Sequence, residues 1–93
     1  MRIVTSGRVF VLTATEGYLG EMMGIEPLEN QLIIVLRSWS FVGNTGQRNV
    51  FESGTLDTNS EVEVAPPEAV KCIPMTSVIS WGTWPGTLPT TTR

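Results

Sequence analysis

The chain contains no histidine and a single cysteine, Cys72, and both shortages exclude chemistry. Without histidine there is no Ser-His-Asp or Cys-His arrangement, and one cysteine among scattered carboxylates makes no metal cluster of familiar spacing. A single cysteine also excludes an internal disulfide, which is typical of a reducing compartment. We therefore expect no enzymatic activity, no cofactor and no metal.

Long apolar runs are also missing. No stretch reaches the roughly 20 consecutive apolar residues that a membrane-spanning helix needs. The first residues do not show the basic segment followed by an apolar one that marks a secretory signal. The sequence predicts a cytoplasmic protein without membrane contact.

Charge is scarce as well, with 16% charged residues against 41% hydrophobic ones. Such a composition suggests that part of the surface is covered in an oligomer. The net charge is −3, from nine acidic and six basic residues, and every basic residue stands singly. Because capture of nucleic acid needs several neighbouring cations, one subunit should bind it weakly, although a ring multiplies each cation by its copy number.

Apolar alternation and β-branched residues predict strands along most of the chain. We read Gly17 as the turn residue with positive φ, and the glycines that follow as bend points. In the longest strand, Ile33 and Val35 are expected to face the core. The predicted strands cover residues 8–13, 18–25, 31–42, 70–73 and 78–81, and residues 61–64 alternate only briefly before a diproline.

The remaining segments are rich in turn-forming residues. Residues 43–60 are expected to form a variable arm or loop, and residues 83–93 an extended or disordered tail beyond a domain of residues 1–82. Both segments hold few core-forming residues, so we expect them to be dispensable for folding. Phe51 in the arm and Trp84 in the tail are the residues expected to anchor a partner.

Residues 7–37 are similar to the first motif of the Sm/LSm family, in which two strands precede a Gly-x-Asp-x-x-x-Asn loop and an apolar strand. Glu26 stands where the family has aspartate. Residues 70–82 keep the apolar frame of the second motif but carry Pro74-Met75 in place of Arg-Gly. The residues that match the first motif are Val9, Val11, Tyr18, Gly20, Met22, Gly24 and Asn30.

The resemblance implies an all-β fold, a five-stranded, strongly bent SH3-like open barrel of Sm type without the family's N-terminal helix. It also implies a homo-oligomeric ring of about five to seven subunits that holds single-stranded RNA. The residues at the implied RNA positions are Glu26, Leu28, Asn30, Thr76 and Ser77.

Several of these positions depart from the family. Leu28 cannot stack on a base, and Pro74 replaces the cation that would cover the base from the other side, although stacking contributes about 1–3 kcal/mol per base. Asn30 and Glu26 have an alternative interpretation as a loop clasp, with Asn30 in a left-handed turn.

The last two predicted strands are expected to be sheet edges that pair between subunits. The expected interface residues are Val70, Cys72, Val78, Ile79 and Trp81; Cys72 alternatively serves as a small core residue. Trp39 and Phe41 project to one side of their strand, either into a core or interface or as an exposed stacking platform. Two functions stay open. One is an Sm-like ring with degenerate RNA binding. The other is a ring-shaped scaffold that binds protein, such as a viral or mobile-element accessory protein.

Overall fold

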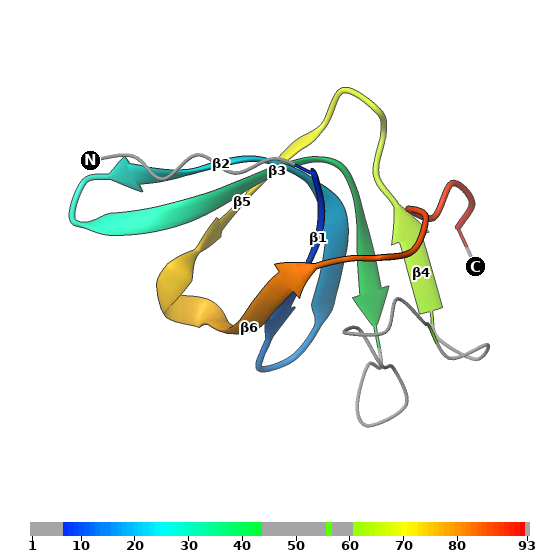
Figure 1. Cartoon of the computed structure of the whole chain (residues 1–93), viewed down its shortest axis with the longest axis horizontal. Helices are drawn as coiled ribbons and strands as arrows, with labels where there is room; N and C mark the ends of the chain where they lie inside the picture. Colours follow the sequence, from blue (N-terminus) through cyan, green and yellow to red (C-terminus); the bar gives the residue numbers. More distant parts are fainter. Residues whose placement is uncertain (1–6, 44–55, 57–60, 93) are drawn as a thin grey trace.

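The computed structural model describes residues 7–43, 56 and 61–92. In these residues the fold is all-β, a six-stranded antiparallel open sheet with one short 3-10 turn (Figure 1). No helix in the same ranges has the length and apolar character needed to cross a membrane. The elements are β1 (Gly7–Thr13), β2 (Gly17–Leu28), β3 (Gln31–Gly43), β4 (Glu61–Val64), β5 (Val70–Pro74), the 3-10 turn η2 (Met75–Ser77) and β6 (Val78–Thr83).

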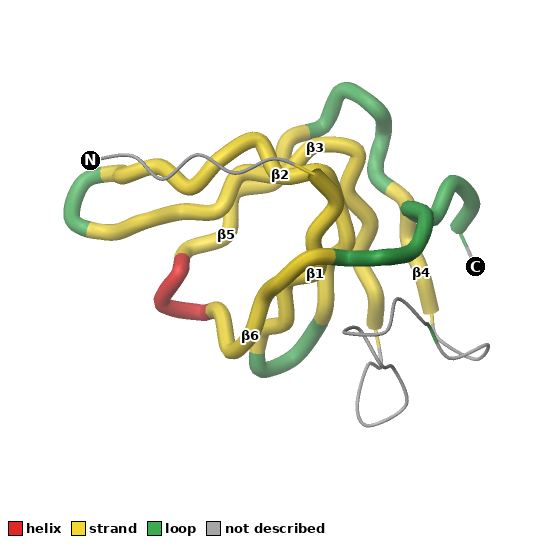
Figure 2. The backbone as a smooth tube through the Cα atoms, in the orientation of Figure 1, coloured by secondary structure: helices red, strands yellow, loops and turns green. Residues whose placement is uncertain are grey.

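The long strand β3 organises the sheet. The strand order of the sheet is β4-β3-β2-β1-β6, and β5 pairs with the same edge of β3 as β4 does (Figure 2). The second half of β3 pairs with β4, from Ser40 opposite Val64 to Gly43 opposite Glu61. Its first half pairs with β5. The expected count of five strands is therefore wrong, because the diproline after β4 interrupts the ladder and divides one edge of β3 between two strands.

Apolar side chains gather in two clusters on opposite faces of the sheet. In β1, Val9 and Val11 belong to the first cluster, whereas Phe10 between them belongs to the second. A strand that is buried on both faces in this way is apolar at consecutive positions. The first cluster holds Val9, Val11, Tyr18, Met22, Ile25, Ile34, Leu36 and Ile73, and the second holds Phe10, Leu19, Val42, Val62 and Trp84.

The sheet bends where β2 and β3 lose their regular register. The register shifts between Leu19 and Glu21, opposite Ser38, which has a positive φ of 50°. At Gly20, a Cβ atom would lie 3.1 Å from the Cβ of Trp39 and 3.3 Å from the carbonyl oxygen of Arg37. Gly20 is thus a bend point, as expected, because a side chain here would press against Trp39 and the backbone of β3.

Two local predictions are wrong. The turn between β1 and β2 covers residues 14–16, and Gly17 already lies in β2 without a positive φ. In β3, Ile34 and Leu36 are fully buried, whereas Ile33 and Val35 are half-buried. Since side chains alternate along a strand, a shift of one residue exchanges its two faces.

The C-terminal tail packs against the second cluster. Trp84 is only 3% exposed, its backbone N–H donates to the Arg8 carbonyl at 2.9 Å, and its indole Nε1–H donates to the Thr87 carbonyl at 3.0 Å. The expectation that Trp84 presents itself to a partner is therefore wrong. Phe51 and almost all of the predicted arm lie outside the described residues.

Candidate functional site

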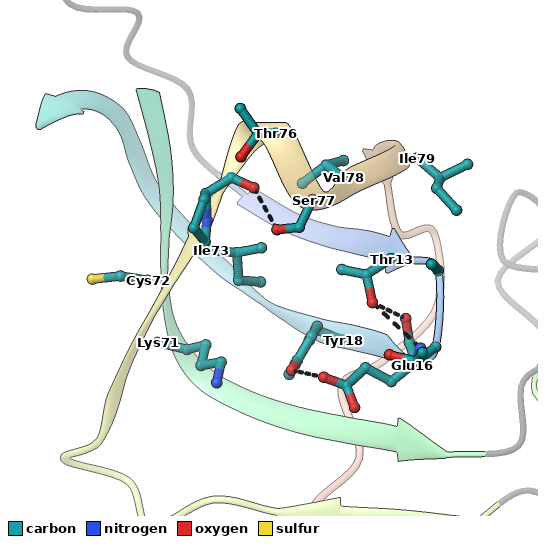
Figure 3. Close-up of a pocket in the computed structure, with 13 residues that line it drawn as sticks. Thr13, Glu16, Tyr18, Lys71, Cys72, Ile73, Thr76, Ser77, Val78 and Ile79 are labelled. Carbon is teal, nitrogen blue, oxygen red and sulfur yellow. Dashed lines mark hydrogen bonds between the residues drawn. The ribbon is translucent and has the colours of Figure 1, made fainter. Parts of the chain in front are cut away.

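Two clefts meet at the side chains of Tyr18 and Lys71. The first, about 450 Å³ in volume, lies between the β1–β2 turn and the segment β5–η2–β6 (Figure 3). The second, about 310 Å³, lies between β2, β3 and the segment that follows β4. Both clefts are lined by Tyr18 and Lys71, so these two residues join them into one continuous face.

The floor of the first cleft is fixed by the β1–β2 turn. The Thr13 hydroxyl donates to the Glu16 carbonyl at 3.0 Å, and the Glu16 N–H donates back to the Thr13 Oγ1 at 3.3 Å. This closed turn aims the Glu16 carboxylate at the Tyr18 hydroxyl, which donates a hydrogen bond to its Oε1 (Figure 3). Burial, followed by that hydrogen bond and by the negative charge of Glu16, raises the pKa of Tyr18 to about 12.

Lys71 enters the site because of the alternation along β5. Ile73 is buried, and Lys71, two residues before it, points to the same side; Val70 and Cys72 point outward. Lys71 Nζ lies 5.2 Å from the centroid of the Tyr18 ring and 5.5 Å from that of Trp39. Both distances fit cation–π contacts. The ammonium group therefore covers the end of the first core cluster.

Three aromatic rings form the wall of the second cleft. Tyr18 meets Trp39 edge to face, with centroids 6.0 Å apart and planes at 61°, and meets Phe41 at 5.9 Å and 81°. Trp39 and Phe41 are half-buried and pack against the first cluster. They do project to one side of β3, as expected, but they form the side of a cleft rather than the centre of a core.

The indole N–H of Trp39 is the unusual group of this cleft. Its Nε1 atom is buried and has no hydrogen-bond partner in the structure. A buried donor without a partner costs about 1–3 kcal/mol, so native proteins rarely keep one without a reason. The Ser40 hydroxyl is also buried without a hydrogen-bond partner, but it faces the second cluster, away from the cleft.

The residues expected to bind RNA fall into two groups at the same end of the sheet. Leu28 and Asn30 are exposed at the tip of the β2–β3 hairpin, and Glu26 is half-buried opposite Ile33. Thr76 and Ser77 are exposed in η2, and the Ser77 hydroxyl donates to the Pro74 carbonyl at 2.8 Å.

These two groups are placed at the same end of the sheet by the pairing of β3 with β5. That pairing ends with Ile33 opposite Pro74, so the hairpin tip extends beyond the point where η2 begins. The left-handed position in the tip is Glu29, with φ 55°, and not Asn30. The loop clasp expected of Asn30 is wrong in that respect.

The residues expected at a subunit interface mostly point to solvent. Ile79 is 66% exposed, Val70 54% and Trp81 36%, and the Cys72 thiol is exposed too. Val78 is half-buried and packs against the first cluster. The interpretation of Cys72 as a core residue is wrong, because the buried Ile73 beside it turns Cys72 to the opposite face.

The sequence did not indicate that Glu16, Tyr18 and Lys71 come together in one site. The pattern did not indicate that Lys71 faces the site, because Val70-Lys71-Cys72-Ile73 has apolar residues on both faces of the strand. Glu16 could not be placed either, because its position depends on where the turn ends. In the described ranges, no three histidine, cysteine, aspartate or glutamate side chains come together in a way that would hold a metal ion.

Comparisons with protein-family models, with curated proteins and with solved structures give no match for this chain. The likeness to the Sm/LSm family therefore depends on the residues of the two motifs alone.

Proposed function

We propose that the chain is the subunit of an Sm-like, ring-shaped homo-oligomer, joined through the edges of β5 and β6. The observation that supports this is the pair of open strand edges. Within the described residues, β5 pairs only with β3, and β6 pairs only with β1. Each strand therefore keeps one row of backbone groups that a neighbour can pair with.

The side chains on these two strands suit burial by a neighbour. Val70 on β5 and Ile79 and Trp81 on β6 are large apolar residues with more than a third of their surface exposed. Because two different edges meet, the contact is heterologous, and repeated rotation closes it into a ring. The low charge content of the chain agrees with a surface that is partly covered.

Light scattering of the purified protein tests the ring. We expect one oligomer of defined mass at concentrations of tens of micromolar, and we expect Ile79→Lys to convert it to smaller species, because a charge on β6 opposes burial. Thr90→Lys is the matched control, since it adds the same charge on the exposed tail next to β4 (Figure 1). A parent protein that stays monomeric at these concentrations contradicts the proposal.

A second candidate function is binding of single-stranded RNA at the end of the sheet that carries both the hairpin tip and η2. This placement would present Asn30 and the η2 hydroxyls to one ligand. Titration with U-rich and A-rich oligonucleotides separates the two functions. A uridine preference that Asn30→Ala removes supports RNA binding. Equal and strongly salt-dependent binding of both oligonucleotides argues against a base pocket.

A further inference from the structure

The cleft lined by Tyr18, Trp39 and Phe41 continues into an acidic strip on β4. Phe41 lies opposite Glu63 in the β3–β4 ladder, and Gly43 lies opposite Glu61. Opposite residues in a ladder share one face, so both carboxylates stand beside the aromatic rings. A neighbouring hollow of about 310 Å³ includes Phe41, Glu61 and Glu63 and extends the cleft in that direction. The two hollows share Phe41 and Glu63 and so adjoin each other; we call them together the groove, aromatic at one end and acidic at the other.

We infer that this groove binds a proline-rich segment of a partner protein that carries a basic residue next to its prolines. Three properties of the groove support this occupant. They are the arrangement of the rings, the buried indole N–H that lacks an acceptor, and the carboxylates at the far end.

The ring arrangement suits pyrrolidine rings better than it suits a nucleobase. Tyr18 is inclined at 61° to Trp39 and at 81° to Phe41, so the three rings form ridges and hollows and not a flat platform. A base stacks on a free, flat ring face, whereas a proline-rich segment in the polyproline II conformation places its rings between aromatic ridges. Pro66 adds a further rigid apolar surface to this wall.

The indole N–H of Trp39 requires an acceptor, and a polyproline II segment offers one. In that conformation the backbone makes no internal hydrogen bonds, so its carbonyl oxygens are free to accept. Lys71 lies over the same rings in the free protein. A ligand that enters this cleft displaces the Lys71 ammonium from the ring faces, and a side-chain adjustment of Trp39 then lets its N–H reach a peptide carbonyl.

The charges at the far end determine the rest of the ligand. Glu61 and Glu63 are both exposed, and neither forms a salt bridge in the structure as described. A phosphate group would be repelled here, whereas an arginine or lysine of the ligand would pair with the carboxylates. One turn of polyproline II has three residues and is about 9 Å long. We therefore expect the pattern Pro-x-x-Pro followed by a basic residue, with the prolines at the aromatic end and the basic residue at the carboxylates.

Titration of the full chain with a fluorescent peptide of the pattern Pro-x-x-Pro-x-Arg tests the inference. We expect saturable binding with a dissociation constant of about 10–500 μM, typical of small, shallow interfaces. The same peptide with alanine at both proline positions should bind at least about tenfold more weakly, because it loses the preformed conformation.

Protein variants separate the two ends of the groove. Trp39→Phe keeps an aromatic ring, although a smaller one, and removes the N–H, and we expect about fivefold weaker binding. Glu63→Gln should weaken binding of the arginine peptide by about threefold and leave a peptide with glutamine at that position unaffected. Glu29→Gln, at the exposed hairpin tip, is the matched control and should change neither value. Glu63 is exposed, so its variant tests the groove even if Trp39→Phe disturbs the fold.

Nuclear magnetic resonance supplies a second readout. The indole N–H resonance that disappears in Trp39→Phe should move downfield when the peptide is added, since a hydrogen bond forms. No saturable binding by the folded parent overturns the inference. Equal binding of the alanine peptide also overturns it, as does displacement of the peptide by oligouridine. The groove lies within one protomer, and light scattering of each variant separates its failure from a failure of the ring.

Discussion

Single residues decide where this sheet bends, and Gly20 is the clearest example. It lies opposite the irregular stretch of β3 that contains Ser38, where the two backbones approach each other closely. The atoms that a Cβ would meet belong to the backbone or are Cβ atoms themselves, so they cannot rotate away. The bend of the sheet is therefore favoured by a residue without a side chain at position 20.

Gly20→Ala should lower the free energy of unfolding by about 1–3 kcal/mol, because the added methyl group forces the two strands apart. Gly24→Ala is the matched control, since a Cβ there would lie 3.7 Å from the Glu26 Oε2 atom, an ordinary contact. We expect that variant to be neutral or slightly stabilised. Chemical denaturation of both variants measures the difference, and equal effects would contradict this account of the bend.

Tyr18 should make the stability of the protein fall at high pH. Its pKa is about 12 in the folded chain and 10.0 when unperturbed. A raised pKa means that the folded state keeps its proton where the unfolded state loses it. The contribution is therefore fully present below pH 10 and is lost as the pH rises from 10 to 12.

Denaturation at several pH values measures this loss. Tyr18→Phe should show a smaller decrease between pH 10 and 12 than the parent protein does. Glu16→Gln should also show a smaller decrease, since it removes the negative charge and weakens the acceptor that favour the protonated phenol. If the parent and Tyr18→Phe lose stability in parallel, the phenol is not the responsible group.

At the level of elements, the sequence predicted most of the strands but not how they divide the sheet. The alternation of β1 and the long apolar run of β3 identified both strands, because periodicity depends only on nearby residues. The pairing of β3 with two partners could not be predicted, since it depends on contacts between distant segments. The face of β3 was assigned wrongly because residues 32–36 are all apolar, so alternation gave no direction.

The tail shows the same limit. Its threonines, prolines and glycines are typical of an extended segment, and the described part does run without regular secondary structure. Composition could not indicate that Trp84 reaches the second cluster, because the residues it contacts lie in distant strands. The candidate site was predicted poorly for the same reason, since Glu16, Tyr18 and Lys71 come from three separate segments.

Trp84→Ala should destabilise the protein by about 3–5 kcal/mol, the usual cost of removing a large buried aromatic ring. This replaces the sequence-based expectation that the whole tail is dispensable. Removal of residues 90–93 is the matched control and should cost little, because it spares Trp84 and the Leu88 side chain that packs near it. Thermal unfolding measures both, and an unchanged melting temperature in Trp84→Ala would contradict the packing of the tail.

At the level of the whole molecule, the proposed assembly and the proposed groove use different parts of the sheet. The ring would use the open edges of β5 and β6, whereas the groove is built on β2, β3 and β4. A ring would display one groove per subunit, so a partner with several proline-rich segments would bind with increased avidity.

The Cys72 thiol offers a direct test of the proposed assembly. It is exposed on β5 in the single chain, and the ring would cover it. We expect a maleimide to react slowly with Cys72 in the parent protein and at least about tenfold faster in Ile79→Lys, because covered thiols are protected until the contact opens. Equal reaction rates in the two proteins would place the assembly contact elsewhere.

The division of β1 between two clusters has a consequence for how the chain finds its fold. A strand with one polar face is held in register by hydrophobicity, but β1 is apolar on both faces, so a slip of one residue would still bury apolar groups. The size of the side chains, and not their polarity, then distinguishes the native register of β1. Phe10 lies opposite Gly82, where a Cβ would come within 3.0 Å of the Phe10 ring. In the β1–β6 ladder a slip of one residue would place that ring against Trp81 or Thr83 instead of a glycine, so the space at Gly82 favours the native register.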